Sequence, residues 1–522
     1  MLSAMITGKP ISFSGLAKVI KAAFWRGTLR NSACELYEAD DDVTAEWEVP
    51  IPIADGITLR AHIFKPKSLV EKGEKVPVIM CAHPYNNNIC LPLNGKKNCA
   101  GMESGVESQW SAPQQYHLIP QAGKPRFSKL TSWEAPDPAF WVKNGYAVVN
   151  LNLPGFGGSE GDSSCFHPSQ SKAYYEAIEW AGEQDWCTGS VGLNGVSFLA
   201  ITQYHVSVCR HYGGPPKALK CISPWEALSC MRRDLMGTNG IDDLGFGAFW
   251  WNTEVLPAIT GLDMKKKDEL FRKTMRARPA DWTSHEDADE IFANINVGLG
   301  PKDFEKMSTP MLLCLSFSDH GMHTQGSSRC WRNSTNLKER WLYTHRTGKW
   351  DSYYSDEVHE MTLKFMDHYL KGKDNGWEKT PPVRLEVRSA KDVIHEVRYE
   401  QAFPLPDTQY IKLFPTTAGM LKEGSSGGDT GEKTYSGSGG SLRFTYTFAE
   451  PTETTGYFKT VLEAEARDGS PDMCVFVNVF KLDKKGENVP FYGSVGSRID
   501  GVTRGIMRAS FRALDLVQET AL

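Results

Sequence analysis

Short, strongly apolar runs recur along the first two thirds of the chain, each bounded by turn residues. They are VPVIMCAHPYN, AVVNLNLPGFGGSEGD, GSVGLNGVSFLA, ALKCISPWEA, TPMLLCLSFSD and the shorter ERWLYTH. Segments with helical character, such as SQSKAYYEAIEWAGEQ, lie between them. Strands that are apolar on both faces and alternate with helices are typical of a parallel sheet in an α/β domain. Before them, EWEVPIPIADGITLRAHIFKP predicts a hairpin around an Asp-Gly turn.

Two stretches interrupt this alternation. Residues 86–135 are polar and rich in Gly, Pro and Asn, and they are too long for an ordinary connection, so we expect a functional loop there. Residues 228–306 have helical character (KKKDELFRKTMRARP, HEDADEIFANI) and lie between two strands, which predicts an inserted helical cap. The catalytic α/β domain would then comprise residues 1–227 and 307–378.

The pattern changes near Pro381. The segments RLEVRS, QYIKLFP, LRFTYTF, YFKTVLEAEA and MCVFVNVFKLD are strand-like and are separated by Gly/Ser-rich turns. Residues 379–522 are therefore predicted to form a separate all-β domain.

Net charge, apolar runs and cysteine content indicate which binding partners and which cellular compartment to expect. The 522 residues carry a net charge of −5, which argues against a nucleic-acid or acidic-membrane partner. No run of eighteen apolar residues occurs, so we expect no membrane-spanning helix. The start lacks the features of a secretory signal, although SGLAKVIKAAFW could form a basic amphipathic helix that packs on the protein or serves targeting. The 12 cysteines contain no CxxC pair, which favours reduced thiols and a cytoplasmic location.

A candidate nucleophile lies at a predicted strand-to-helix turn. In SVGLNGVSFLAITQYHVS a strand leads to Gly195, Val196 and Ser197, and a helix follows. An α/β-hydrolase presents its serine on such a strained turn, which needs small neighbours. The usual pentapeptide is GxSxG, whereas here Leu199 occupies the last position and Ala200 follows it.

The partners of such a serine follow it along the chain as an acid and then a histidine, each after a later strand. MLLCLSFSD ends in Asp319 and ERWLYTH ends in His345, so we predict these two residues as the partners of Ser197. His320 and His323 adjoin the acid itself, and His359 and His368 lie in a helix. We expect those four to be surface or loop histidines.

An oxyanion needs hydrogen-bond donors beside the nucleophile. The backbone N–H of Phe198 is one candidate, and Tyr85 in CAHPYNNN is a second, with packing as its alternative role. Trp225, in ISPWEA, either lines the acyl pocket or supports the cap hinge.

With these residues in place, the sequence resembles the cocaine esterase / X-prolyl dipeptidyl-peptidase (CocE/NonD) family of α/β-hydrolases. The matching segments lie in the same order over nearly the whole chain: HPY, AFWVKNGYAVVNLNLPGFGGSEG, EWAGEQDWCTGSVGLNGVSFLA, ISPWEA, SFSDHGMHTQG, FMDHYLKGKDNG, PPVRLEV and RGIMRASFRALD. The resemblance implies an α/β-hydrolase domain with a helical cap and a C-terminal jelly-roll (galactose-binding-like) β-sandwich. It also implies the triad Ser197, Asp319 and His345, the oxyanion donors Tyr85 and Phe198, and neither a metal nor an organic cofactor.

The sequence departs from the family pattern near the site. Asn152, Leu153, Pro154 and Gly155 stand where members usually have Asp-x-Arg-Gly, and SFSD replaces a Gly-Trp form before the acid. His345 also lacks the usual preceding Pro-Trp. Because of these changes, neither cocaine nor Xaa-Pro peptides can be inferred as the substrate from the resemblance.

The sequence is compatible with four functions. The main prediction is a serine hydrolase that cleaves an ester, thioester or amide of a small or medium acyl substrate through an acyl-enzyme on Ser197. The alternatives are an Xaa-Pro dipeptidyl-peptidase, which needs an acidic cluster for a free α-amino group, an acyltransferase, and a non-hydrolytic binding protein or cyclase.

The β domain is shorter than the family pattern implies. We therefore expect its uncovered surface to contact a second copy of the chain or the catalytic domain, with a truncated isoform as the alternative.

Overall fold

The computed structural model describes residues 35–85, 125–163, 165–241, 245–259, 298–391, 393–425, 428–429, 431–493 and 500–511. The predicted N-terminal amphipathic helix and most of the predicted 86–135 loop lie outside these residues. The chain divides into two compact units, one formed by Met1–Arg398 with Ala464–Leu522 and the other by Tyr399–Glu463.

A ten-stranded sheet forms the centre of the first unit, in the order β12-β11-β10-β9-β8-β7-β4-β6-β3-β2. Its strands are β2 (Val43–Pro52), β3 (Thr58–Pro66), β4 (Val76–His83), β6 (Ala147–Asn152), β7 (Cys187–Val196), β8 (Leu219–Trp225), β9 (Met311–Ser316), β10 (Arg340–His345), β11 (Val383–Ala390) and β12 (Val393–Glu400). The strands from β6 through β4, β7, β8, β9 and β10 to β11 are parallel neighbours. β2 and β3 form the predicted antiparallel hairpin, and β3 joins the sheet antiparallel to β6. The prediction of a parallel α/β sheet is confirmed.

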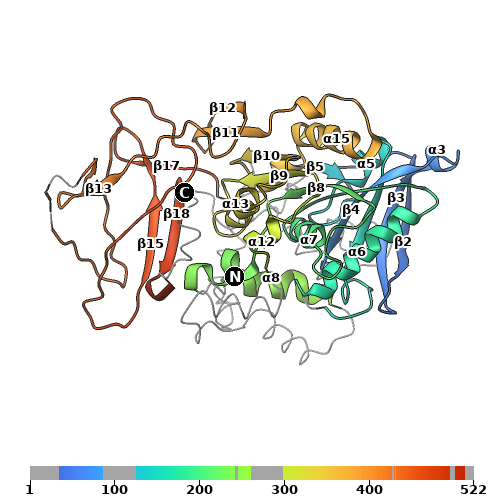
Figure 1. Ribbon diagram of the computed structural model, residues 1–522, viewed down its shortest axis with the longest axis horizontal. Helices are drawn as coiled ribbons and strands as arrows, with labels where there is room; N and C mark the ends of the chain where they lie inside the picture. The colour runs from blue at the N-terminus through green and yellow to red at the C-terminus, as the bar shows by residue number, and fades with distance from the viewer. Residues whose placement is uncertain are drawn as a thin grey trace, which may run out of the picture. The chain divides into compact units, whose positions relative to one another are not determined.

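Helices cover both faces of this sheet, as Figure 1 shows. They are α5 (Pro138–Lys143), α6 (Pro168–Glu183), α7 (Phe198–Ser207), α13 (His323–Asn333), α14 (Lys349–Tyr353) and α15 (Asp356–Lys371), with the short α3 (Lys67–Val70) at the edge. α5 and α15 lie on one face, where Trp141, Phe365 and Trp377 belong to the main apolar core. α6, α7 and α13 lie on the other. Because both faces are covered, β4, β6 and β9 are buried along their whole length, which explains their continuous apolar sequence.

The insertion between β8 and β9 is helical where it is described. It contains η1 (Arg232–Met236), η2 (Thr238–Gly240), α8 (Gly245–Trp250), η3 (Trp251–Val255), α9 (Leu256–Ala258) and α12 (Pro301–Phe304). Residues 242–244 and 260–297 of the predicted cap, residues 228–306, lie outside the described residues, and the bounds of the cap stay a prediction.

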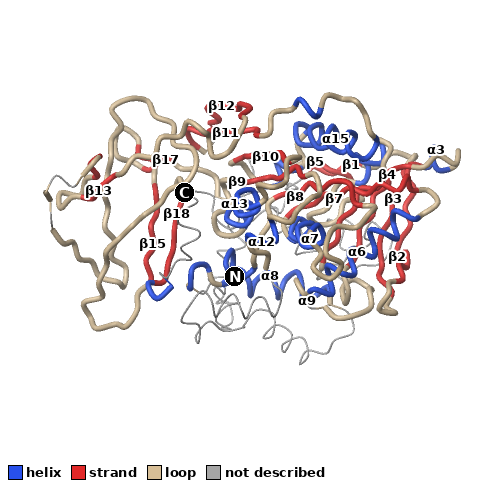
Figure 2. The backbone as a smooth tube through the Cα atoms, viewed as in Figure 1, coloured by secondary structure: helices blue, strands red, loops and turns tan. Residues whose placement is uncertain are grey.

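The C-terminal part contains short β-strands, as the tube in Figure 2 shows in red. They are β13 (Leu413–Pro415), β14 (Leu421–Glu423), β15 (Cys474–Val479), β16 (Lys481–Leu482), β17 (Asn488–Val489) and β18 (Thr503–Arg508), followed by the turn η6 (Ala509–Phe511). A separate short pair joins β1 (Glu35–Tyr37) to β5 (Arg126–Ser128).

Three details of the C-terminal prediction differ in the structure, and one is that the segment YFKTVLEAEA contains no strand. RLEVRS forms β11, which pairs with β10 and so extends the central sheet beyond the predicted boundary at residue 379. LRFTYTF forms one bridge, between Met420 and Thr445, instead of a strand. An apolar alternation shows which side chains favour a strand, but a ladder also needs a neighbouring backbone.

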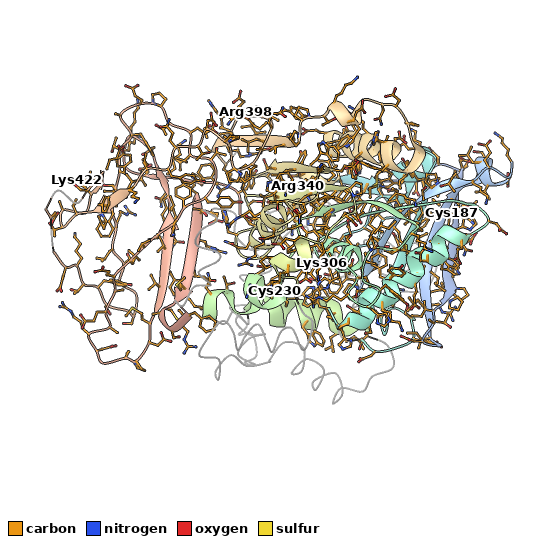
Figure 3. The ribbon with its side chains drawn as sticks, in the orientation of Figure 1. Cys187, Cys230, Lys306, Arg340, Arg398 and Lys422 are labelled. Atoms are coloured by element: carbon orange, nitrogen blue, oxygen red, sulfur yellow. The ribbon has the colours of Figure 1, made fainter. Side chains whose placement is uncertain are left out.

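The cysteines of the described residues carry free thiols. Nine are free, and eight of these are buried, including Cys187 at the start of β7 and Cys230 after β8 (Figure 3). None of the described helices has the length and apolar run needed to cross a bilayer.

Candidate active site

Ser197 lies on the predicted turn between β7 and α7. Its backbone has φ 57° and ψ −115°, a combination that a non-glycine residue adopts at a cost. The Ser197 N–H donates to Trp225 O at 3.0 Å, and the Ser197 carbonyl accepts from Ala200 and Ile201. Gly195 is required here, because a Cβ at this position would lie 2.6 Å from the Leu199 Cβ. The strand–turn–helix geometry thus presents the serine hydroxyl at the carboxyl edge of the sheet.

His323 contacts this hydroxyl. Its Nε2 lies 3.0 Å from Ser197 Oγ, and its Nδ1 lies 2.5 Å from Asp319 Oδ2. With Nδ1–H donating to the carboxylate, Nε2 presents its lone pair to the serine. The histidine and the aspartate are almost fully buried. Asp319 is therefore linked to the serine through His323 and not through the predicted His345.

The turn between β9 and α13 places this histidine. The Asp319 carbonyl accepts from both Met322 N–H and Thr324 N–H at 3.1 Å, and the Thr324 hydroxyl donates to Ser316 O at 2.8 Å. Gly326 lets α13 approach the chain after β8, since a Cβ there would lie 2.4 Å from Ser229 N. The helix therefore begins close enough to the sheet edge for its first residue to reach Ser197.

His345 has different partners. It ends β10 as predicted, but its Nε2 lies 3.0 Å from Glu226 Oε1 and its Nδ1 accepts from the Thr347 N–H at 3.3 Å. Both ring nitrogens are thus occupied, and Nε2–H points at a carboxylate instead of presenting a lone pair. The structure therefore corrects the predicted pairing of Ser197 with His345.

Lys349, the first residue of α14, connects the two histidine pairs. Its Nζ lies 3.2 Å from Asp319 Oδ2, 3.4 Å from Glu226 Oε2 and 3.1 Å from His323 Nδ1. All of these groups are buried, and one cation between two carboxylates offsets part of their desolvation cost. A continuous buried network therefore runs from His345 through Lys349 to Ser197.

This network shifts the pKa values of His323 and Lys349. Burial and the adjacent Lys349 ammonium lower the pKa of His323 below its usual 6.5. The pKa of Lys349 is raised, since the attraction of Asp319 and Glu226 outweighs burial, which acts in the opposite direction. A neutral imidazole and a charged lysine result at neutral pH, and a neutral histidine is the form that can accept a proton from serine.

Tyr85 and Phe198 line the same cavity as Ser197, and their role as oxyanion donors stays a prediction. The Tyr85 hydroxyl accepts from Trp250 Nε1 at 3.1 Å, and the Tyr85 and Phe198 rings have centroids 6.1 Å apart. Burial raises the pKa of Tyr85 well above 10, so its hydroxyl keeps its proton and can donate.

A cavity of about 60 Å³ opens at Ser197, which is space for a few water molecules. Its polar lining includes Tyr85, Glu134, Ser197, Glu254, His323 and Lys349, and the rest is apolar and mostly aromatic. The aromatic and aliphatic lining comes from Trp133, Phe166, Phe198, Phe246, Trp250, Trp350, Ile201, Leu228, Met231, Leu235 and Met322. Cap residues thus form much of the wall.

Trp225 is not among the residues that line this cavity. It is buried and stacks on His345 with ring centroids 5.7 Å apart, and it also contacts Tyr343 and Tyr353. Its position supports packing beneath the site and does not favour the predicted contact with the acyl group, and the alternative role at the cap hinge stays a prediction.

Metal-ligating side chains meet at two places in the described residues. One group is Glu226, Cys314 and His345, and the other is Glu226, Asp319 and His323. The Lys349 ammonium already lies within 3.4 Å of both carboxylates, and it would repel a second cation. We assign no metal to either group.

Comparisons with known proteins identify the family. Residues 55–351, more than half of the chain, match the family model of the X-Pro dipeptidyl-peptidase (S15 family). The chain belongs to this family. Residues 375–521 match the X-Pro dipeptidyl-peptidase C-terminal non-catalytic domain. This S15-family protein is therefore a serine hydrolase with an α/β-hydrolase domain and a C-terminal β domain.

Individual relatives are distant. The chain is similar to a cocaine esterase from Rhodococcus, with 23% identity over 463 residues, which cover 80% of this chain and 70% of the relative. It is also similar to an Xaa-Pro dipeptidyl-peptidase from Lactobacillus helveticus, with 28% identity over 195 residues, but these cover only 33% of this chain and 24% of that one. A crystal structure of a CocE/NonD family hydrolase from Staphylococcus aureus has a TM-score of 0.70 and 27% identity, and covers 94% of this chain and 83% of its own. The family resemblance inferred from the sequence is confirmed.

Proposed function

We propose that this hydrolase cleaves an ester, thioester or amide of a small acyl substrate through an acyl-enzyme on Ser197. The observation that carries the proposal is the hydrogen-bonded chain from Ser197 through His323 to Asp319. His323 takes the serine proton as general base, and Asp319 holds its tautomer and stabilises the imidazolium. Ser197 attacks the acyl carbon, His323 then gives the proton to the leaving group, and water resolves the acyl-enzyme.

The tetrahedral oxyanion is proposed to lie between the Tyr85 hydroxyl and the Phe198 N–H. One such donor contributes about 3–4 kcal/mol to transition-state stabilisation in serine hydrolases. The small cavity with its aromatic wall favours compact acyl groups, so short p-nitrophenyl esters should be cleaved faster than long ones.

Labelling with a fluorophosphonate probe tests this function. The probe should modify Ser197, located by peptide mapping, and the Ser197→Ala variant should remain unlabelled. Folded wild-type protein that resists the probe and leaves p-nitrophenyl esters, acyl-thioesters and Xaa-Pro anilides intact would contradict the proposal.

A second candidate activity is release of N-terminal Xaa-Pro dipeptides, which the names of the family and one relative suggest. The observation in its favour is Glu254, whose carboxyl lines the same cavity and could receive an α-ammonium group. Comparison of free and N-acetylated Xaa-Pro anilides separates the two candidates. A peptidase of this type would cleave the free anilide far faster, whereas an esterase would not need the free amine.

We also propose a cytoplasmic location and self-association through the C-terminal β region. Free, mostly buried thiols support a reducing compartment. Exposed apolar side chains such as Tyr410, Val461 and Leu462 support self-association. Size-exclusion chromatography with light scattering tests the latter, and a clean monomer would contradict it.

A further inference from the structure

Glu134 is a buried acid at the site that the proposed mechanism does not use. Its side chain faces the Tyr85 hydroxyl, the Ser197 hydroxyl and the Phe198 N–H, three potential donors that each act to lower its pKa. Its Oε2 is buried without a hydrogen-bond partner, and the residue lines the cavity. The donors that the proposed mechanism assigns to the oxyanion thus face an acceptor of the protein itself.

The backbone holds Glu134 in this place. Its φ is 63°, in the left-handed region that non-glycine residues rarely adopt, and its carbonyl accepts from the Val196 N–H at 3.1 Å. Val196 directly precedes the nucleophile, so the acid and the serine share one rigid framework. Strain of this kind persists only where the surrounding structure enforces it.

We propose that Glu134 is a proton-dependent gate of the oxyanion site, which admits an acyl group when its side chain is a neutral acid and blocks it as a carboxylate. The proposal rests on the function proposed above. The Phe198 N–H cannot bond fully to both Glu134 and a substrate oxygen, so the acid must give way before the acyl carbonyl binds. A neutral carboxyl yields these donors at lower cost, because hydrogen bonds to a charged acceptor are about twice as strong. A carboxylate would also repel the negative charge that develops on the substrate oxygen and would compete with His323 for the serine proton.

Burial sets the protonation range of this gate. It raises the pKa of Glu134 to about 8, although Lys349 and the hydrogen bonds from Tyr85, Ser197 and Phe198 act in the opposite direction. The neutral acid therefore predominates at pH 7, and the carboxylate predominates above pH 8.

Other titratable groups also surround Glu134. Lys349 stays cationic because its pKa is raised, and Tyr85 and Tyr353 stay neutral to pH 10 because burial raises theirs. His323 has a lowered pKa and titrates below 6.5. Burial and the charge of Glu134 raise the pKa of Glu254, so it is a second acid at the cavity whose charge needs a control.

The test follows the rate of fluorophosphonate labelling at Ser197 from pH 6.5 to pH 10. The wild-type rate should fall about tenfold for each pH unit above 8, as the acid ionises. Glu134→Gln, which keeps the shape without the charge, should remove this fall and react about tenfold faster than wild type at pH 9. Glu254→Gln is the matched control, and its rate should still fall above pH 8.

A stability measurement supplies a readout that does not depend on labelling. An ordinary glutamate titrates near 4.5, whereas the folded Glu134 titrates near 8, so the folded state holds the extra proton between these values. The stability that this proton contributes is fully present below pH 4.5 and is lost as pH rises through 8. The melting temperature of wild type should therefore fall relative to Glu134→Gln over this range.

The labelling profiles distinguish failure of the gate from failure of the proposed function. A wild-type rate that stays flat to pH 10, or an alkaline fall that survives in Glu134→Gln or disappears in Glu254→Gln, overturns the gate while Ser197 remains the nucleophile. If Glu134→Gln does not fold, the wild-type profile and the Glu254→Gln control still decide. If no form is labelled at any pH, the proposed function fails and the gate fails with it.

Discussion

Two buried histidines lie at neighbouring strand ends of the sheet, and their hydrogen bonds are opposite. His323 turns Nδ1 to Asp319 and presents Nε2 to Ser197, whereas His345 turns Nε2 to Glu226 and accepts a backbone N–H on Nδ1. Each has a carboxylate, and Lys349 lies between the two carboxylates. A carboxylate partner alone therefore does not identify a catalytic histidine. What matters is which nitrogen the carboxylate occupies and what faces the other.

The largest expected contrast is between the two carboxylates. Asp319→Asn should lower kcat about 10⁴-fold, because an amide no longer fixes the reactive tautomer of His323 or stabilises its imidazolium. Glu226→Gln should lower kcat less than about tenfold, because Glu226 contacts neither Ser197 nor His323 directly. Steady-state hydrolysis of a short p-nitrophenyl ester measures both. Equal losses in the two variants would remove the distinction between the pairs.

Lys349 connects the two regions, and its removal should affect both. Lys349→Met leaves Asp319 and Glu226 as buried carboxylates without their cation, which should cost about 3–5 kcal/mol of stability in chemical denaturation. Lys67→Met, at an exposed i,i+4 pair, is the control and should cost less than about 0.5 kcal/mol.

The same variant should shift the pH dependence of labelling. Lys349 helps to lower the pKa of His323, so its loss should raise that pKa and move the acid limb of the rate toward higher pH. In wild type the acid limb should lie below pH 6.5, since the base stays neutral down to its lowered pKa. An acid limb that Lys349→Met leaves in place would show that the ammonium does not influence the reacting histidine.

The smallest effect is expected beneath His345. Trp225→Phe removes part of the ring that stacks on His345, and a loss of about 1–2 kcal/mol in stability follows from the lost packing. The preference among ester chain lengths should stay the same, since Trp225 does not line the cavity. An altered chain-length preference in a stable variant would restore its predicted role in the acyl pocket.

The sequence predicted the elements of the catalytic domain well, because buried parallel strands have an unmistakable apolar pattern. The turn at Ser197 was also predictable, since a glycine is needed where Gly195 meets Leu199. Which histidine contacts Ser197 was not predictable from the sequence. Strand order places both Asp319 and His345 at the same sheet edge, and only the folded turn that starts α13 brings His323 to the serine.

One signal for His323 was present in the sequence. His323 follows Asp319 by four residues, a spacing at which one turn of chain can bring an imidazole back to a carboxylate. Glu134 gave no such signal, because its contacts with Tyr85, Ser197 and Phe198 arise from segments far apart in the chain. Long-range contacts of this kind depend on the complete fold.

The most direct test of the account is the fluorophosphonate labelling rate of His323→Gln beside that of His345→Gln, at equal concentrations of folded protein. We predict that His323→Gln lowers the rate at least about 10³-fold, whereas His345→Gln changes it less than about tenfold. The reverse result, with His345→Gln inactive and His323→Gln still reactive, would contradict the assignment of His323 as the base and restore the family pattern at His345.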